Sequence, residues 1–382
     1  MDIRIRLFNV RLFEDAGILR ASLKKRTHGR TCILGLVLTL IGAAVGSGSA
    51  SAEDGGFTLQ SPYVFGGHQY KVQLHTHTVN SDGDHTPQWV MQEYAKMGYA
   101  AVAITDHHYR VRSSPSLDDP EEHSIFHIPG VEYSADQRNR SWNHMLGIMI
   151  QTIHLADGIH DRQAQINQAH AEGGLAYLCH PYDEHIHRRG WNSDDILSLV
   201  KDYDGIEIHN GSSYHEPGGR DYPYKVDLVL MSGRRINVIA VDDFHRNPSE
   251  TMDRGYVVVN CSADGDAVTR DDMIAALKSG NYFSAGRVST SHPTSPRFTE
   301  IAISGPAITV ATDKPTDIEF ITARHNYHKE GPNYTYRQEN TTTAEYTASR
   351  DDLFIRVKAV FKEDGLESYA WSNPIYVVME EE

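Results

Sequence analysis

The chain has 382 residues and a formal net charge of −15, from 36 Lys and Arg against 51 Asp and Glu. This length is sufficient for a sizeable hydrophobic core and for two domains. The acidic balance argues against a general nucleic-acid-binding protein and against attraction to an anionic membrane, because both partners are themselves negatively charged.

Residues 1–52 have the features of an export signal. A basic stretch over residues 20–30 precedes 14 mostly apolar residues, 32–45, and an A-x-A cleavage pattern ends at Ala52. The apolar run is shorter than the roughly 20 residues that span a bilayer. We therefore expect a cleaved signal peptide, an exported (periplasmic or extracellular) protein and no stable membrane span; an uncleaved N-terminal anchor is the alternative. Removal of residues 1–52 would leave 28 basic and 48 acidic residues.

The first predicted strand after this segment, 71–74, leads into two histidines, His75 and His77. Side chains alternate along a strand, so both histidines are expected on the same face. A helix is predicted over 87–97, and the next strand, 100–104, ends in the sequence TDHH. Strands that deliver imidazoles and carboxylates at their carboxyl ends are typical of active sites in α/β barrels.

Strands and helices continue to alternate along the chain. The sequence predicts strands over 126–131, 145–150, 175–179, 205–208 and 237–241, and helices over 161–172, 193–202 and 225–231. The apolar cores of the strands indicate burial on both faces. We therefore predict an α/β fold with a closed or nearly closed (βα)7 barrel.

The pattern changes after Pro296. Residues 255–286 contain one further strand and one helix, whereas short alternating runs of β-forming residues, separated by Gly, Pro, Asn and Asp, follow Pro296. These runs predict an antiparallel β-sandwich, whose expected role is to pack against and shield the barrel. The predicted organisation is a signal peptide over 1–52, a linker over 53–67, a hydrolase barrel over 68–290 and a β-sandwich over 296–382.

Histidines are concentrated in the predicted barrel. Of the 22 in the chain, 18 lie between His68 and His245. A single His-x-His pair is a weak signal, but further candidate ligands stand at the ends of separate strands: His107, Glu132, His144, His180, Asp243 and His245. Strand ends converge at one mouth of a barrel. Nitrogen and oxygen ligands without sulfur suit two or three divalent ions such as Mn²⁺, Zn²⁺ or Fe²⁺.

Seven motifs resemble, in order and approximate spacing, the polymerase and histidinol phosphatase (PHP) family. They are His75-x-His77, Ser81-Asp82-Gly83, Thr105-Asp106-His107, Pro129-Gly130-Val131-Glu132, His144, His180-Pro181 and Asp243-x-His245. The resemblance covers roughly residues 68–250 and implies a distorted seven-stranded barrel with metal-dependent phosphoesterase activity. The segments 278–286 and 371–375 also resemble exported members that carry a C-terminal β-sandwich.

The resemblance implies three groups of metal ligands. Carried over by position, they are His75, His77, Glu132 and Asp243 for a first ion, Glu132 as a bridge with His144 and His180 for a second, and Asp82, His107 and His245 for a third. Some relatives carry a histidine where this chain has Asp82. The nearby His85 competes with Asp82 for that role.

The metals would provide the nucleophile in the implied reaction. Two ions about 3.5–4 Å apart lower the pKa of a bridging water toward 7, and the resulting hydroxide would attack phosphorus in line. Through these ions, Glu132, His180 and Asp243 are the predicted catalytic residues. Arg110 and Arg246 follow ligand motifs and could bind phosphate bidentately; for each, a solvated loop arginine is an equal alternative.

Five further polar residues could orient the ligands through hydrogen bonds. They are Asp106, His108, Glu207, His209 and Asp242. Glu207 and His209 could equally be core residues whose hydrogen bonds are satisfied.

Three functions remain open on these residues. The first is hydrolysis of a small-molecule phosphoester. The second is hydrolysis of a carboxylic ester, carbamate or amide on the same metal site, because the same hydroxide can attack a carbonyl carbon. The third is metal-dependent binding without catalysis, with the sandwich as the interaction module. The sequence does not indicate an oligomeric state.

Overall fold

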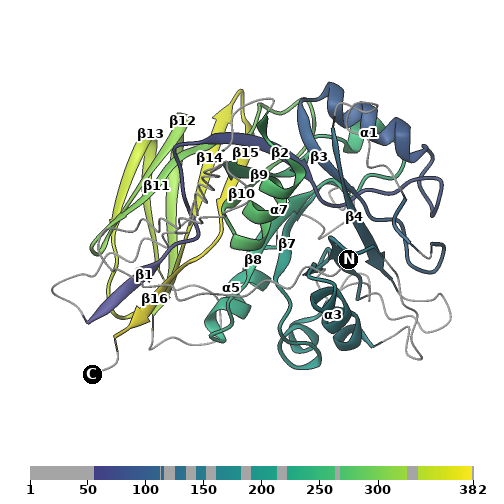
Figure 1. Cartoon of the computed structure of the whole chain (residues 1–382). Coiled ribbons are helices and arrows are strands. Elements are labelled where there is room, and N and C mark those ends of the chain that lie inside the picture. Colours follow the sequence, from purple (N-terminus) through teal and green to yellow (C-terminus); the bar gives the residue numbers. More distant parts are fainter. Residues whose placement is uncertain are drawn as a thin grey trace, which may run out of the picture. The chain divides into compact units, whose positions relative to one another are not determined.

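The computed structural model describes residues 56–111, 113–115, 125–134, 143–151, 161–181, 191–212, 222–262, 267–324 and 334–380. The predicted signal peptide lies outside these residues. Those described belong to one compact unit of mixed α/β structure, in which helices pack against a large sheet (Figure 1). None of the helices in the described ranges is long and apolar enough to cross a membrane.

Seven strands of this sheet follow one another in space as they do in the sequence. They are β2 (His68–Gln73), β3 (Tyr99–Ile104), β4 (Phe126–Tyr133), β5 (Met145–Ile148), β6 (Leu175–Leu178), β7 (Gly205–Asn210) and β8 (Asn237–Val241). The chain segments that follow the first and last of these strands also contact each other. The Asp243 amide donates to the His75 carbonyl at 3.1 Å, and the His77 amide donates to the Phe244 carbonyl at 2.8 Å. The carboxyl ends of β2 and β8 therefore meet, while β9 (Gly255–Cys261) pairs with the rest of β2.

One strand departs from the regular βα repeat that we predicted. β5 is antiparallel to both β4 and β6, with Met145 opposite Tyr133 and Leu178, which are the last residues of those two strands. The beginning of β5 consequently lies at the same edge of the sheet as the carboxyl ends of its neighbours. This reversal places His144, which precedes β5, at the edge where the other candidate ligands stand.

The helices follow the predicted pattern with two exceptions, a short unpredicted helix over 248–251 and the segment over 193–202. Their bounds are α1 (Pro87–Lys96), α3 (Arg162–Ala171), α5 (Pro223–Met231), α6 (Pro248–Thr251) and α7 (Arg270–Ser279). The predicted helix over 193–202 is reduced to one wide turn, η1 (Asp195–Leu199). Its carbonyl groups are used elsewhere, because the Arg234 guanidinium donates to the carbonyls of Ile196 and Val200 at 2.8 and 3.0 Å.

Helix α7 begins with a reciprocal cap, which gives a test of local stability. The Thr269 hydroxyl accepts from the Asp272 amide at 3.2 Å, and the Asp272 carboxylate accepts from the Thr269 amide at 2.8 Å. Thr269→Ala should cost about 1 kcal/mol in the free energy of unfolding, because one amide of the first turn loses its acceptor. Urea unfolding measures the loss. Thr269→Ser keeps the hydroxyl and should stay close to the parent; equal losses in both variants would contradict a capping role.

The C-terminal strands are antiparallel, as predicted, but they continue the sheet of the first part. They are β10 (Tyr282–Arg287), β11 (Phe298–Ser304), β12 (Ala307–Arg324), β13 (Tyr334–Thr347), β14 (Asp352–Glu363), β15 (Leu366–Ser372) and β16 (Ile375–Met379). β10 pairs with β9 on one side and with β15 on the other. A sandwich that forms a separate domain therefore stays a prediction.

Residues 57–60, which we placed in a linker, form a strand of the C-terminal part. This strand, β1 (Phe57–Gln60), pairs antiparallel with β16. Phe57 and Leu59 point to the same face and are buried, so the strand is held by apolar burial as well as by its hydrogen bonds.

Buried polar contacts join the two parts. The Arg356 guanidinium on β14 donates two hydrogen bonds to Asp227 on α5, at 2.6 and 2.7 Å, and both side chains are 3% exposed. The Asn373 side chain accepts from the Val238 amide at 2.8 Å and donates to the Gly280 carbonyl at 2.9 Å. Such paired groups fix the position of β14 and β15 against α5 and β8.

Candidate metal centre

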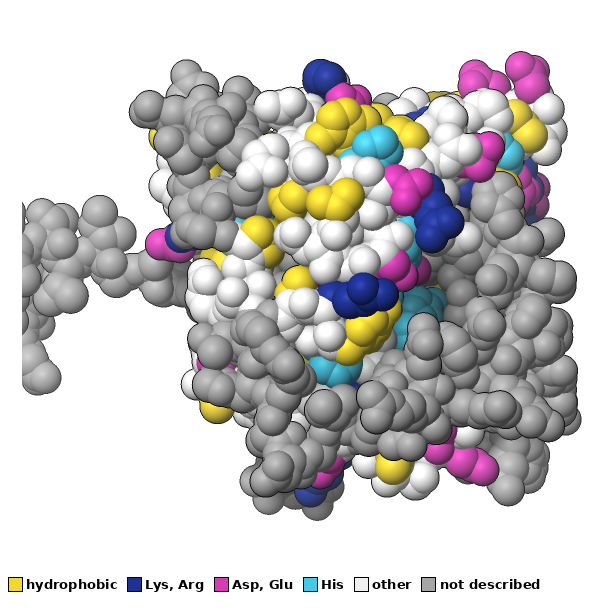
Figure 2. Space-filling view, turned by 90° about the vertical axis from the view of Figure 1, so that its right-hand side faces the viewer, with side chains coloured by type: hydrophobic (Ala, Val, Ile, Leu, Met, Phe, Trp, Pro, Cys, Tyr) yellow, Lys and Arg dark blue, Asp and Glu magenta, His cyan; other side chains and the backbone are white. Residues whose placement is uncertain are grey.

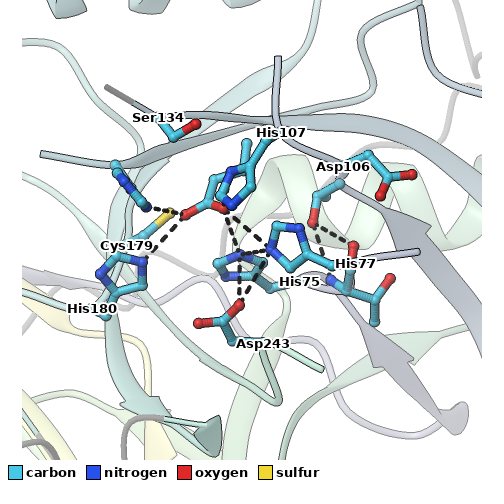
Figure 3. Close-up of polar contacts among 12 residues, drawn as sticks. His75, His77, Asp106, His107, Ser134, Cys179, His180 and Asp243 are labelled. Carbon is cyan, nitrogen blue, oxygen red and sulfur yellow. Dashed lines mark hydrogen bonds and ion pairs between the residues drawn. The ribbon is translucent and has the colours of Figure 1, made fainter. Parts of the chain in front are cut away.

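The candidate ligands come together at one end of the seven strands, although they are far apart in the sequence. His75 and His77 follow β2, His107 follows β3, Glu132 lies in β4, His144 precedes β5, His180 follows β6, and Asp243 and His245 follow β8. Figure 3 shows the side chains of His75, His77, His107, His180 and Asp243 directed toward one another. The residues implied as ligands of the first and second ions, the two groups that share Glu132, are thus near neighbours.

Glu132 is the centre of this arrangement, because its two oxygens face different histidines. Oε2 lies 3.2 Å from His77 Nε2, 2.9 Å from His107 Nδ1 and 3.5 Å from His75 Nε2. Oε1 lies 2.8 Å from His144 Nδ1 and 3.2 Å from His180 Nε2. The carboxylate is 1% exposed. One buried side chain therefore has an oxygen available to each of two groups of ring nitrogens.

Asp243 completes the first group. Its Oδ1 lies 3.3 Å from Nε2 of both His75 and His77. The two Nε2 atoms are themselves only 3.1 Å apart. Glu207 accepts from His75 Nδ1 at 2.7 Å, so a neutral His75 carries its proton on Nδ1 and presents a lone pair at Nε2. Lone pairs and carboxylate oxygens thus converge on one small region.

A third group forms around Asp82. Its two oxygens lie 3.4 Å from His107 Nε2 and 3.4 Å from His245 Nε2, and 3.6 Å from His77 Nδ1. His85, the competing candidate, lies outside this group: its ring stacks on Trp89 at 3.7 Å between centroids. The geometry favours Asp82 over His85 as the residue that joins the cluster.

This set of donors fits divalent cations. Oδ1 of Asp243 and Nδ1 of His107 are buried, and among the described residues their close neighbours are charged groups of the cluster, without a well-aligned hydrogen bond. Both atoms face the cluster, where an ion would satisfy them.

Burial by itself would raise the pKa of Glu132, but His144, His107 and His75 together hold that pKa well below its usual range. His75 and His77 likewise outweigh the effect of burial on the pKa of Asp243. Both carboxylates are therefore ionised and able to bind metal.

Two of these residues have strained backbones. His180 has a φ of +26° and Asp243 a φ of +53°, in the left-handed region that residues other than glycine seldom adopt. Such conformations cost on the order of 1–3 kcal/mol each and cluster at functional sites. Both residues leave their strands at this edge, and the conformation turns their side chains into the cluster.

The residues expected to orient the ligands divide into two kinds. Glu207 makes the contacts expected for this role: besides His75, it accepts from the His180 amide at 2.6 Å. Asp106 accepts from the Thr78 hydroxyl at 2.7 Å and the Ser81 hydroxyl at 2.6 Å, and so fixes the loop that carries Asp82.

The other three candidates support the surrounding fold. Asp242 accepts from the Arg254 and Gly255 amides, both at 2.8 Å. His108 accepts from the Ser134 amide at 3.0 Å. His209 points away from the cluster and stacks on Trp371, with 5.7 Å between centroids.

Cys179 also lies at the site, although its sequence context did not indicate this. Its thiol lies within 4.8 Å of the ligand atoms of Glu132 and His180. The residue looked like an apolar member of strand β6, and only its position next to His180 could have indicated proximity to the centre. Burial raises the pKa of this thiol well above its usual value, and nearby carboxylates add to the rise, so it is a neutral packing group here.

The comparisons with known proteins can now be set beside this geometry. No protein-family model and no curated protein matches the chain. Solved structures do match. A two-domain protein from Bacteroides vulgatus, containing a predicted PHP-like metal-dependent phosphoesterase, matches with a TM-score of 0.42 and 15% identity, over 82% of this chain and 92% of that one.

The chain is similar to PHP-like proteins. Endonuclease Q, in complex with a duplex that carries an abasic lesion, matches with a TM-score of 0.36 and 14% identity over 55% of this chain and 57% of its own. An amidohydrolase from Chromobacterium violaceum matches with a TM-score of 0.34 and 17% identity over 47% of this chain and 89% of its own. Because these scores and identities are low, we infer function from the residues of this chain.

The two arginines that we expected to bind substrate lie beside the PHP-like ligand motifs and are exposed. Arg246 Nε lies 3.9 Å from Asp84. Arg110 lies 5.6 Å from the centre of the Tyr109 ring. Figure 2 shows histidine side chains reaching the surface close to basic and acidic side chains.

Proposed function

We propose that this chain is an exported metal-dependent phosphoesterase that acts on small-molecule phosphoesters with two or three divalent ions, Mn²⁺, Zn²⁺ or Fe²⁺. The observation that carries the proposal is the division of Glu132: one oxygen faces His75, His77 and His107, and the other faces His144 and His180. A carboxylate shared in this way between two groups of imidazole nitrogens is suited to bridge two cations.

The residues would hold these ions in the groups that the sequence implied. The first group is His75, His77, Glu132 and Asp243, the second is Glu132, His144 and His180, and the third is Asp82, His107 and His245. When bound, such ions polarise phosphoryl oxygens and make a water acidic enough to react at neutral pH.

The chain's own residues supply order and charge balance. Glu132 and Asp243 provide the negative charge that neutralises the cations, and Glu207 keeps His75 in the tautomer that presents Nε2. Because His75, His77 and Glu132 are almost completely buried, bulk water is kept from the inner side of the centre. The outer side is formed by less buried residues, Asp82 and His245, where a substrate can enter.

Support for export comes from the sequence pattern of residues 1–52 and not from the described structure. Fractionation of a tagged full-length chain, followed by N-terminal sequencing of the exported form, tests this part. A mature N-terminus near residue 53 is the expected result. Retention of the whole chain inside the cell would remove export from the proposal without affecting the metal chemistry.

The activity is tested by nitrophenol release from an aryl phosphomonoester, an aryl phosphodiester and an aryl acetate. The Mn²⁺-loaded protein is compared with His180→Ala, which removes a ligand of the second group. Phosphoester turnover that disappears in the variant is the expected result. Acetate turnover alone would replace the phosphoesterase by a carbonyl hydrolase on the same ligands. Binding of metal without turnover of any ester would favour a non-catalytic binding protein.

Metal binding should be visible without any substrate. At a concentration 100 times the Kd, one bound ion stabilises the folded state by about 2.7 kcal/mol, so Mn²⁺ should raise Tm by several degrees over chelator-treated protein. Differential scanning fluorimetry measures the shift. His180→Ala should lose part of it, whereas His170→Ala, which removes a histidine paired with Asp204 on the outside of the fold, should keep it. A Tm that does not respond to Mn²⁺, Zn²⁺ or Fe²⁺ would contradict the proposed centre.

A further inference from the structure

A tyrosine and an arginine stand next to the candidate metal centre, two and three residues after the proposed ligand His107. The Tyr109 ring stacks on the His107 ring, with 5.2 Å between centroids and 20° between planes. Tyr109 is nevertheless 40% exposed, so it lies at the rim of the site. Because His107 in turn contacts both Glu132 and Asp82, the tyrosine is in contact with the part of the centre that opens to solvent.

Arg110 lies against this tyrosine. Its guanidinium is over the Tyr109 ring, 5.6 Å from the ring centre. Arg110 is exposed, and no carboxylate within the described ranges forms an ion pair with it. Contact with a tyrosine ring offsets no formal charge, so the donors of the guanidinium can bind an anion.

The other arginines near the centre are less suited to this task. Arg246 lies 3.9 Å from Asp84, which offsets part of its charge. Arg162 is 3% exposed, and two of its nitrogens donate within the protein: Nε to the Asn143 carbonyl and Nη1 to the Gln165 side chain. Of these three, Arg110 combines exposure, contact with Tyr109 and, among the described residues, the lack of an ion pair.

We propose that Arg110, held in place by Tyr109, is the substrate-binding cation of this site and makes it prefer phosphomonoesters to phosphodiesters and to neutral carboxylic esters. The inference rests on the proposed function and specifies its substrate class. A phosphomonoester presents three non-bridging oxygens and up to two negative charges, a diester two oxygens and one charge, and a carboxylic ester no charge. A guanidinium at the rim therefore stabilises the bound monoester most, through charge-assisted and bidentate hydrogen bonds.

The test compares Arg110→Met, Arg110→Lys, Tyr109→Phe and Tyr109→Leu in the full, Mn²⁺-loaded chain. KM and kcat are measured for an aryl phosphomonoester, an aryl phosphodiester and an aryl acetate, and the Kd of inorganic phosphate is measured by calorimetry. The matched control is Arg235→Met, because Arg235 is also exposed and also lies over a tyrosine ring, Tyr376 at 4.9 Å, but precedes β8 at the opposite edge of the sheet. Metal content and Tm establish that each variant is folded and loaded.

We expect Arg110→Met to raise the monoester KM and the phosphate Kd by about 10- to 100-fold, which corresponds to the loss of one charged hydrogen-bonding partner. The diester KM should rise less and the acetate KM by less than about twofold, while kcat changes little. Arg110→Lys should recover part of the phosphate affinity, because a lysine restores the charge but not the paired donors. Tyr109→Leu should shift the same parameters in the same direction, Tyr109→Phe less so, and Arg235→Met should match the parent.

Unchanged phosphate affinity in Arg110→Met, or an equal loss of kcat on all three esters, would overturn the proposal even if the parent hydrolyses phosphoesters. Failure of the proposed function would give a different result. The parent protein would then hydrolyse no phosphoester, and the Kd of inorganic phosphate, measured by calorimetry, would still show whether Arg110 binds phosphate. An effect of Arg235→Met equal to that of Arg110→Met would also overturn the assignment, because it would show a general dependence on surface charge.

Discussion

Glu132→Gln should remove phosphoester turnover and at least one metal ion from the protein. Glutamine has nearly the same shape as glutamate but keeps one carbonyl oxygen, so only one of the two histidine groups retains an acceptor. Its amide group would also point hydrogen atoms toward a cation. We expect kcat to fall by about 10²- to 10³-fold or more, the scale on which the loss of one charge-stabilising group acts in catalysis. Metal analysis by mass spectrometry should show the lost ion directly.

Glu207→Gln is the matched control for this experiment. Glu207 is equally buried but contacts the centre through His75 Nδ1 and the His180 amide. Its replacement should leave every ligand in place and weaken metal affinity by about 10- to 100-fold, as is usual for a group that orients a ligand. Excess metal should therefore restore much of the Glu207→Gln activity and little of the Glu132→Gln activity. Equal rescue of both variants would contradict a bridging role for Glu132.

The strand ends of the fold could be predicted from the sequence because apolar runs followed by histidine or aspartate mark both the strand and its chemistry. His75, His77 and His107 follow their strands where expected, and Asp243 follows β8. The reversal of β5 could not be predicted in this way. A short apolar run has the same pattern in either direction, and only the pairing of Met145 with Tyr133 and Leu178 shows which edge His144 joins.

Long-range contacts were the main limit on predicting the site. The role of Glu207 depends on its reaching His75, 132 positions earlier in the chain, which no local pattern encodes. The same sequence signal, a polar residue within an apolar strand, fits His209 equally well, yet His209 packs on Trp371. The wide turn at Asp195–Leu199 also depends on a distant residue, because Arg234 takes up its carbonyl groups. Spacing along the chain identifies candidates, and tertiary packing then separates ligands from core residues.

Asp227→Asn should destabilise the protein strongly, although Asp227 is not part of the candidate site. Arg356 and Asp227 form a bidentate pair, at 2.6 and 2.7 Å, with both side chains 3% exposed. Removal of one charge leaves the other buried without its partner, which typically costs 3–5 kcal/mol. Arg356→Met should cost a similar amount. Urea unfolding, followed by intrinsic fluorescence, measures both losses.

The same pair tests whether the C-terminal strands and the metal-binding part unfold together. Asp227 lies on α5 and Arg356 on β14, so the broken pair weakens the contact between the two parts. If they form one cooperative unit, both variants should shift a single transition, and Mn²⁺ should stabilise that whole transition.

The double variant Asp227→Leu/Arg356→Met should be less destabilised than either single variant, because no charge remains buried alone. As a control, Lys96→Met breaks the exposed pair with Glu93 and should change stability by less than about 1 kcal/mol. A second transition in Asp227→Asn, with only one of the two responding to Mn²⁺, would show instead that the C-terminal strands fold as an independent domain.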